Sequence, residues 1–419
     1  MTADCWCRCR CICLQAARAS CLMIRVCFQA GSFKENLMTS SLRLTGMSLA
    51  LFAGLGLSAH AAEPRVVLGV AVPLSGPLAA SGQDAVNGVQ MALNQLNAEH
   101  ARIGGKTVRW AMDAEDDQGL PTQATLVAQK LVDEGVSGVI GHQTSGCTYP
   151  AARIYARAGI PQITPSSTSP KIAEQGYKTF FRLIANDNAL GAGLAEYAHD
   201  ALHVQRVAVV DDRTAYGQGL ADVFSAKAKK LGMDVVDREY TDDKATDFSA
   251  ILTRIKADHP QVIFYGGMYS QAGPLVRQMR QIGMTARLLG GDGICAPIMA
   301  KVAGDAVNGT ICAQGGAPLS ELPKGQAWKA RYDTEFGAAA FQLYSPNAFD
   351  AAMVLAHAMM KARSSDPKVY LPYIRHIDYD GVTDSDIHFT ATGELADPSI
   401  TLSEFEHGVK VPLAVEQVR

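Results

Sequence analysis

An alternation of short apolar runs with amphipathic segments constrains the fold more than any other feature of the chain. It occurs twice, first after residue 64 and again after residue 185. The short runs are rich in valine and isoleucine and are typical of buried strands, whereas apolar residues recur at helical spacing in the longer segments. We predict strands at residues 65–72, 108–114, 138–141, 161–164, 206–210, 234–239, 262–266 and 287–290, and helices at residues 86–96, 121–134, 151–158, 190–202, 217–231, 248–257 and 271–282. This order predicts an α/β fold with two doubly wound parallel sheets in series.

The residues after 290 carry fewer strand-like runs. Helical patterns occur near 324–336 and 346–362, and a strand-like run lies near 387–389. These segments supply too little sheet for a third unit of the same kind. We therefore predict that the C-terminal part of the chain returns to complete the first two units.

The composition is that of a folded protein, because 48% of the 419 residues are hydrophobic and 19% are charged. The formal net charge of −3 argues against nucleic acid as a partner, which would require clustered lysine and arginine. No apolar run after the N-terminal region is long enough to span a membrane. We expect no cofactor, because neither a dinucleotide-binding glycine pattern nor a P-loop occurs.

The N-terminal region has the features of an export signal. Arg43 follows Met38, residues 47–58 are apolar, and Ala59-His60-Ala61 is typical of a signal-peptidase site. We predict a leader over residues 1–61 with its true start at Met38, and cleavage after Ala61 or Ala62. The product would be periplasmic and without a lipid anchor, because no cysteine lies at the cleavage site.

Residues 1–37 are then either an extension translated from a wrongly chosen start or part of an untypically long leader. They contain seven of the ten cysteines. The spacing of these cysteines resembles neither a zinc site nor a disulfide framework, so we predict no metal there.

Polar residues follow the predicted strands at the edge where α/β sheets bind ligands. Ser145 lies after strand 138–141 at the start of a helix, and Ser166, Ser167 and Thr168 follow strand 161–164 in the same relation. Their hydroxyls and the helical N–H groups could hold a carboxylate. N-capping explains the same residues equally well, and the two interpretations are compatible.

A possible counter-group lies in Gly290-Gly291-Asp292-Gly293, where flexible backbone could bring the Asp292 carboxylate into a cleft. An ammonium group would be its natural partner. The alternative is an ordinary turn aspartate, which glycine-rich loops favour.

Six motifs at matched spacing resemble those of the periplasmic branched-chain amino-acid-binding proteins, the type I solute receptors of ABC importers. They are Pro73-Leu74-Ser75-Gly76-Pro77, Gly141-His142 with Ser145, Thr164-Pro165 with Thr168, Tyr216-Gly217, Tyr265-Gly266-Gly267, and Gly293 after an acidic residue. The resemblance extends over residues 65–415. It implies two lobes, residues 63–185 with 316–397 and residues 186–315 with 398–419, which are joined by three crossovers and close on a ligand.

The resemblance also implies how a ligand would be held. The residues that match family binding positions are Ser145 and Thr168 for the α-carboxylate, assisted by backbone groups near Gln143 and Ser166, Asp292 with its neighbour Gly293 for the α-ammonium, and Tyr216 and Tyr344 for the side-chain pocket. The acid is one methylene shorter than the family glutamate. Ser81 and Met268 replace family aromatics, which leaves room for a bulkier or more polar amino acid than the default leucine, isoleucine or valine.

Several other candidates have simpler interpretations. Cys295 and Cys312 are 17 positions apart, and we predict a disulfide between them in an oxidising periplasm. Cys147 is expected to be buried and inert. His142 has no acidic partner in the pattern and is interpreted as structural. The consecutive acids Glu115-Asp116-Asp117 would point in different directions, so no metal site is predicted.

The sequence therefore predicts a monomeric solute-binding protein that delivers an amino acid to a membrane permease. The alternative is a sensory module of the same fold that reports an amino acid or amide to a signalling partner. An enzyme is not expected, because no nucleophile with an adjacent base, paired carboxylates or cofactor loop is present.

Overall fold

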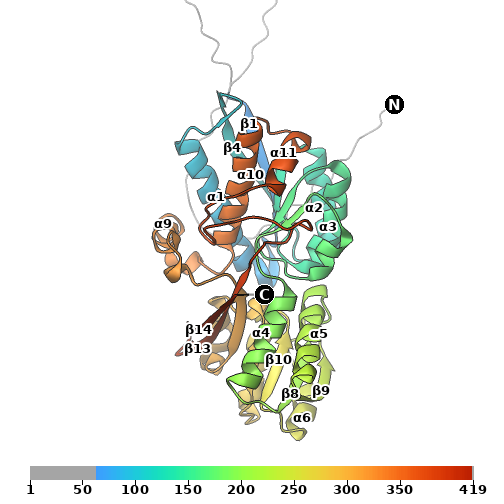
Figure 1. Cartoon of the computed structure of the whole chain (residues 1–419). Helices are drawn as coiled ribbons and strands as arrows, with labels where there is room; N and C mark the ends of the chain where they lie inside the picture. Colours follow the sequence, from blue (N-terminus) through green and yellow to red (C-terminus); the bar gives the residue numbers. More distant parts are fainter. Residues whose placement is uncertain (1–62, 418–419) are drawn as a thin grey trace, which may run out of the picture. The chain divides into compact units, whose positions relative to one another are not determined.

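The computed structural model describes residues 63–417, which contain a five-stranded parallel sheet and a seven-stranded mixed sheet (Figure 1). The first sheet has the order β4-β1-β5-β6-β7, and all its neighbours are parallel. Its strands are β1 (Arg65–Val72), β4 (Arg109–Asp116), β5 (Gly138–Gly141), β6 (Gln162–Thr164) and β7 (Phe180–Arg182). The helices of this part of the chain are α1 (Ala79–Ala98), α2 (Pro121–Asp133), α3 (Ser145–Ala158), α9 (Gly325–Phe336), α10 (Ser345–Ala362) and α11 (Pro367–Arg375).

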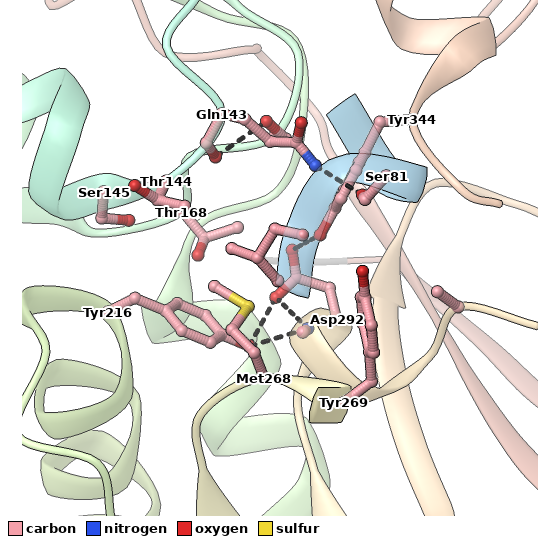
Figure 2. Close-up of a pocket in the computed structure, with 14 residues that line it drawn as sticks. Ser81, Gln143, Thr144, Ser145, Thr168, Tyr216, Met268, Tyr269, Asp292 and Tyr344 are labelled. Carbon is pink, nitrogen blue, oxygen red and sulfur yellow. Dashed lines mark hydrogen bonds between the residues drawn. The ribbon is translucent and has the colours of Figure 1, made fainter. Parts of the chain in front are cut away.

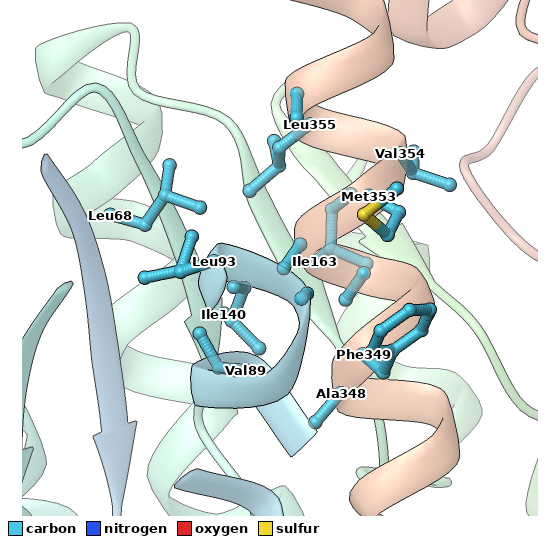
Figure 3. Close-up of a cluster of buried hydrophobic side chains, with 14 of the residues drawn as sticks. Leu68, Val89, Leu93, Ile140, Ile163, Ala348, Phe349, Met353, Val354 and Leu355 are labelled. Carbon is cyan, nitrogen blue, oxygen red and sulfur yellow. The ribbon is translucent and has the colours of Figure 1, made fainter. Parts of the chain in front are cut away.

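Helices cover both faces of the first sheet, and β1 shows why its sequence is almost continuously apolar. Leu68 and Val70 join the hydrophobic cluster formed with α1 and α10, and Figure 3 shows Leu68 near Val89 and Leu93 of α1. Ala71 faces the other way and joins the cluster formed with α2 and α3. Because successive side chains of a strand point to opposite faces, a strand buried on both sides must be apolar at every position.

The second sheet has the order β14-β13-β12-β11-β10-β8-β9. Its strands are β8 (Arg206–Asp211), β9 (Asp234–Tyr240), β10 (Val262–Gly266), β11 (Arg287–Gly290), β12 (Ile311–Gly315), β13 (Ser399–Glu406) and β14 (Val409–Gln417). The first five are parallel, and β13 and β14 add an antiparallel hairpin to β12. The helices here are α4 (Asp187–Asp200), α5 (Ala215–Lys230), α6 (Ser249–Ala257), α7 (Tyr269–Gln281) and α8 (Ile298–Ala303).

Short elements complete the described chain. They are the two-stranded sheet β2 (Arg102–Ile103) and β3 (Lys106–Thr107) and the 3-10 turns η1 (Gly76–Leu78), η2 (Pro170–Gln175), η3 (Asp292–Ile294), η4 (Gly304–Val307), η5 (Leu319–Glu321) and η6 (Ala338–Ala340). In residues 63–417, no helix has the length and apolar character needed to cross a bilayer. The predicted leader lies outside the described residues.

The predicted α/β class is confirmed, and the C-terminal region differs in detail from its prediction. The strand predicted near 387–389 is wrong, since Ile387 and Phe389 each form only an isolated bridge. The sheet contributed by this region is the β13–β14 hairpin, which was not predicted. Its turn contains His407 and Gly408, both with positive φ. That geometry suits a tight hairpin, but histidine in place of asparagine or aspartate hides the usual sequence signal.

The chain passes between the two sheets three times, after β7, after β12 and before β13. The lobe boundaries at 185/186, 315/316 and 397/398 stay a prediction. Cys295 and Cys312 form a disulfide that ties the segment after η3 to β12. A loop of this length contributes about 3 kcal/mol to stability in the chain-entropy account. Cys147 is free and buried, and burial raises the pKa of its thiol.

Candidate ligand-binding site

Loops from both sheets meet at one cavity (Figure 2). Its lining residues are Leu78, Ser81, Gln143, Thr144, Ser145, Ser166, Thr168, Tyr216, Met268, Tyr269, Asp292, Gly293, Ala296 and Tyr344. All ten residues predicted to contact a ligand are in this set. The structure brings them together, and their roles in binding stay a prediction.

The first wall of the cavity carries hydroxyl groups with free hydrogen-bonding capacity. Thr144 and Thr168 have buried Oγ1 atoms without a hydrogen-bond partner among the described residues. Ser145 is the first residue of α3, and its Oγ accepts a hydrogen bond from Ser169 N at 3.2 Å. This leaves the Ser145 proton available to an acceptor in the cavity. An unpaired buried hydroxyl is unfavourable, and a polar group in the cavity would supply the missing partner.

The N-capping interpretation of these residues is wrong. The N-cap of α3 is Thr144, and its side chain makes no capping hydrogen bond. Thr168 does not precede an α-helix, because the chain continues through a loop into the 3-10 turn η2, whose N-cap Ser169 also makes no capping bond. Pro170 stands at the start of that turn and supplies its fixed φ.

Buried hydrogen bonds fix the loop that presents Thr168. Ser166 Oγ donates to Gln143 O at 2.9 Å. The guanidinium of Arg182, which is fully buried, donates to Ser169 O at 2.8 Å and also to Ser167 O, and its Nε pairs with Glu394 at 2.8 Å. The loop therefore holds the Thr168 hydroxyl in place through side chains from β7 and from the C-terminal region.

The opposite wall carries the Asp292 carboxylate, which is 2% exposed. Its Oδ1 accepts hydrogen bonds from Tyr216 OH at 2.7 Å and Gly293 N at 3.1 Å, and its Oδ2 accepts one from Tyr344 OH at 2.8 Å. Burial raises the pKa of Asp292, while the tyrosine hydroxyls oppose that rise. This is not the environment of an ordinary exposed turn aspartate. One acceptor position on Oδ2 remains open to a donor.

The glycines around Asp292 permit this close packing. A Cβ at Gly291 would lie 2.5 Å from Leu220 Cδ2 and 2.8 Å from Tyr216 OH, and a Cβ at Gly293 would lie 2.6 Å from Gly267 O. Larger residues would push the Asp292 loop away from Tyr216.

Two hydrogen bonds join the walls across the cavity. Tyr344, at the start of α10, bonds to Asp292 of the other wall, and Tyr269 OH of α7 donates to Pro77 O at 2.9 Å. The enclosed free space is only about 20 Å³, enough for about one water. An outer cavity of about 400 Å³ adjoins it and shares Leu78, Thr144, Tyr216 and Met268. A ligand the size of leucine does not fit the inner cavity unless its lining residues move.

Comparison with known proteins identifies the architecture. The family described as "Periplasmic binding protein" matches residues 65–406. The chain belongs to this family. This periplasmic binding protein is 33% identical over 364 residues to "Leu/Ile/Val-binding protein homolog 1" of Brucella abortus (strain 2308), covering 87% of this chain and 96% of that relative.

Solved structures agree with that assignment. The leucine binding protein LivK of Thermotoga maritima has a TM-score of 0.77 at 28% identity and covers 84% of this chain and 98% of its own. LivJ of Streptococcus pneumoniae in complex with isoleucine has a TM-score of 0.76 at 26% identity, covering 84% and 99%. The periplasmic binding protein is therefore a solute-binding protein with the type I fold, and the resemblance found in the motifs is confirmed.

Asp187 is a feature of this periplasmic binding protein that sequence reasoning missed. It lies in the first turn of α4, is fully buried, and neither carboxylate oxygen has a hydrogen-bond partner among the described residues. Burial is the main cause that raises its pKa to about 8, and the charge of Asp292 is the second. The nearby Thr168 hydroxyl and the positive charge of Arg182 oppose this rise. The only sequence signal is an acid in a first helical turn, which is common for capping and dipole reasons.

Glu115, Asp116, Asp117 and His142 each have a partner within the protein. The prediction that His142 lacks an acidic partner is wrong, since its Nδ1 lies 2.7 Å from Asp117 Oδ2 and its Nε2 lies 3.1 Å from Tyr155 OH. Glu115 pairs instead with Lys130, and Asp116 accepts a bond from Leu74 N. The three consecutive acids thus have separate partners, and residues 63–417 contain no cluster of acids, histidines or cysteines arranged for a metal.

Proposed function

We propose that this protein binds a branched-chain or related α-amino acid as a zwitterion between the two walls of the cavity. The observation that carries the proposal is the pairing of free hydroxyls on one wall with a buried carboxylate on the other. Relatives named as Leu/Ile/Val-binding and leucine-binding proteins support the ligand class.

The α-carboxylate would occupy the first wall. Thr168 and Ser145 would donate their hydroxyl protons to it, and the first N–H groups of α3, which have no acceptor within the helix, would serve as further donors. Charge-assisted hydrogen bonds of this kind are stronger than neutral ones, and more so in a water-poor cleft.

The α-ammonium would approach the open acceptor position of Asp292 Oδ2. Because aspartate is shorter than the family glutamate, the ammonium would sit deeper in the second wall or bind through a water. Asp187 lies close enough to Asp292 for their charges to interact, and the ligand's ammonium would favour ionisation of its carboxyl, whose pKa of about 8 leaves it protonated at neutral pH in the ligand-free protein. Leu78, Met268 and Tyr269 would contact the ligand's side chain, with the outer cavity leaving room for larger ones.

We infer that the lobes, 63–185 with 316–397 and 186–315 with 398–419, open and close about the three crossovers. A ligand favours closure only through its greater affinity for the closed form. The protein would act as a monomer in the periplasm, without catalysis, and deliver its ligand to the permease of an ABC importer. The signal peptide, cleaved after Ala61 or Ala62, would direct export.

Both charges of the ligand should be required for binding. Isothermal titration calorimetry of the purified protein should detect leucine, isoleucine or valine. We expect 4-methylpentanoate, which lacks the ammonium, and isoamylamine, which lacks the carboxylate, to bind about 100-fold more weakly than leucine, since each leaves charged or polar protein groups unpaired. Equal affinity for leucine and 4-methylpentanoate would disprove the zwitterion site. Methionine and phenylalanine belong in the same panel as larger side chains.

The Thr168 hydroxyl should contribute directly to affinity. We expect Thr168→Val to weaken amino-acid binding by about tenfold or more, because a hydrogen bond to a charged group is lost without a change of shape. Thr168→Ser keeps the hydroxyl and should remain close to wild type. Thr253→Val is a matched control, since Thr253 is exposed on α6 and bonds only to Ser249 O. If Thr168→Val kept the wild-type affinity, the Thr168 hydroxyl would not be a ligand-binding group.

A further inference from the structure

A second cavity lies where the chain passes between the sheets. It has a volume of about 290 Å³ and shares Tyr344 with the candidate ligand-binding site. Ile184, Gly315, Gly316 and Thr401 line it, each close to one of the three passages. We call it the hinge cavity.

Among residues 63–417, the charged side chains that line the hinge cavity are both lysines. Lys329 and Lys410 line the hinge cavity, and no aspartate or glutamate does so among the described residues. Lys329 is neutralised by Asp333, with distances of 2.6 and 2.7 Å from Nζ to the two carboxylate oxygens. The hinge cavity is thus electrostatically complementary to an anion.

Lys410 supplies the unbalanced charge. Its Nζ donates to the neutral Gln314 Oε1, and within residues 63–417 no carboxylate lies within ion-pair distance. Burial lowers its pKa to about 8. Two ammonium protons remain for other acceptors, because an ammonium has three donors. A half-buried cation without a counter-ion is unfavourable, and an anion in the cavity would relieve it.

The neighbouring strands define the polar end of the hinge cavity. In the β13–β14 hairpin, Ser403 lies opposite Pro412 and Phe405 lies opposite Lys410. Alternate residues of a strand share a face, so Lys410, Pro412 and Ser403 face the same side, and all three line the cavity. Ser403 therefore presents its hydroxyl to the same cavity as Lys410.

The rest of the lining is mostly apolar and includes Leu319, Leu322, Phe341 and Pro346. A polyanion such as phosphate would leave charge against these side chains. An amino acid would find no acid for its ammonium. Lys410 and the apolar part of the hinge cavity together suit a ligand that carries a single negative charge on an apolar body.

We propose that the hinge cavity binds a small organic monocarboxylate, with its carboxylate on Lys410 and Ser403 and its apolar body against Leu319, Leu322 and Phe341. This site is separate from the amino-acid site and does not depend on the proposed function.

The test uses benzoate as the probe, titrated calorimetrically into the Ser145→Ala, Thr168→Val protein, in which the hydroxyls of the first cavity are removed. We expect saturable benzoate binding that becomes about tenfold weaker or more when Lys410→Met is added, because a charge-assisted bond is lost. Adding Lys230→Met instead should change nothing, since Lys230 is exposed at the end of α5. Benzyl alcohol and inorganic phosphate should bind far more weakly than benzoate.

A crystal of the wild-type protein soaked with 4-bromobenzoate locates the site without any substitution. The bromine anomalous peak is expected in the hinge cavity. A peak only elsewhere, undiminished benzoate affinity in the Lys410→Met protein, or preferential binding of phosphate would each overturn the proposal. Failure of leucine to bind would refute the proposed function and leave these results unaffected, because the benzoate measurements do not involve Asp292 or the first-wall hydroxyls.

Discussion

Asp292→Asn is expected to weaken amino-acid binding by about 100-fold or more and, at the same time, to raise the thermal stability of the ligand-free protein. Binding is lost because the ligand's ammonium no longer meets a negative charge in a buried site. Stability rises because burial disfavours the charged form of Asp292 and raises its pKa, and a neutral asparagine does not carry this desolvation cost. Asparagine keeps an oxygen that can accept the hydrogen bond of a tyrosine hydroxyl.

The prediction is specific because the affinity for the ligand should fall while the stability of the ligand-free protein rises. Titration calorimetry gives the affinity for leucine, and thermal unfolding without ligand gives the stability. Asp305→Asn is the matched control, since Asp305 is exposed in η4 of the same part of the chain. A variant that lost both affinity and stability would indicate a structural role for Asp292, and one that kept its affinity would refute the proposed ammonium site.

Asp187→Asn is expected to stabilise the ligand-free protein at neutral pH and to reduce the pH dependence of its stability. The pKa of Asp187 is about 8 in the folded protein and about 3.9 in an unfolded chain. Between these values the folded state binds a proton that the unfolded state does not. The free energy of unfolding therefore falls by about 1.4 kcal/mol per pH unit as pH rises, until the loss is complete above pH 8.

Urea unfolding between pH 5 and 8 measures this contribution. In Asp187→Asn, the free energy of unfolding should fall less steeply with rising pH, by about 1.4 kcal/mol per pH unit. Its stability at pH 7 should exceed that of the wild-type protein by about 4 kcal/mol at most. Asp305→Asn should leave the slope unchanged. A slope in Asp187→Asn equal to that of the wild-type protein would show that Asp187 is ionised in the ligand-free protein at all these pH values.

Local signals predicted the strands best where an apolar run is bounded by glycine or by charged residues. The strands at 138–141, 262–266 and 287–290 have their predicted bounds. The β13–β14 hairpin was missed because polar residues alternate with or follow its apolar residues, and β12 was missed because its apolar run is only three residues long and is followed by glutamine and glycine. Such strands are recognisable only once a partner strand buries one face.

The candidate site likewise contains some residues that the sequence was enough to select and others that it was not. Ser145, Thr168 and Asp292 follow strands, so chain order and the parallel-sheet rule were enough to select them. Asp187 follows no predicted strand and looks like an ordinary helix-start acid. Its burial depends on the Thr168 loop and on Asp292, which are 19 and 105 positions away in the chain.

The sequence by itself determined the two βα-alternating units and the residues at their strand ends, because periodicity and chain order are local properties. Only the tertiary structure decided that Tyr216 and Tyr344 donate to Asp292. The same holds for Asp187, whose carboxylate has no hydrogen-bond partner within residues 63–417, and for Lys410, which lines a cavity with no carboxylate of that part of the chain within ion-pair distance. These features depend on distances between segments far apart in the chain and on exclusion of water, and the electrostatic environment of a charged group follows from both.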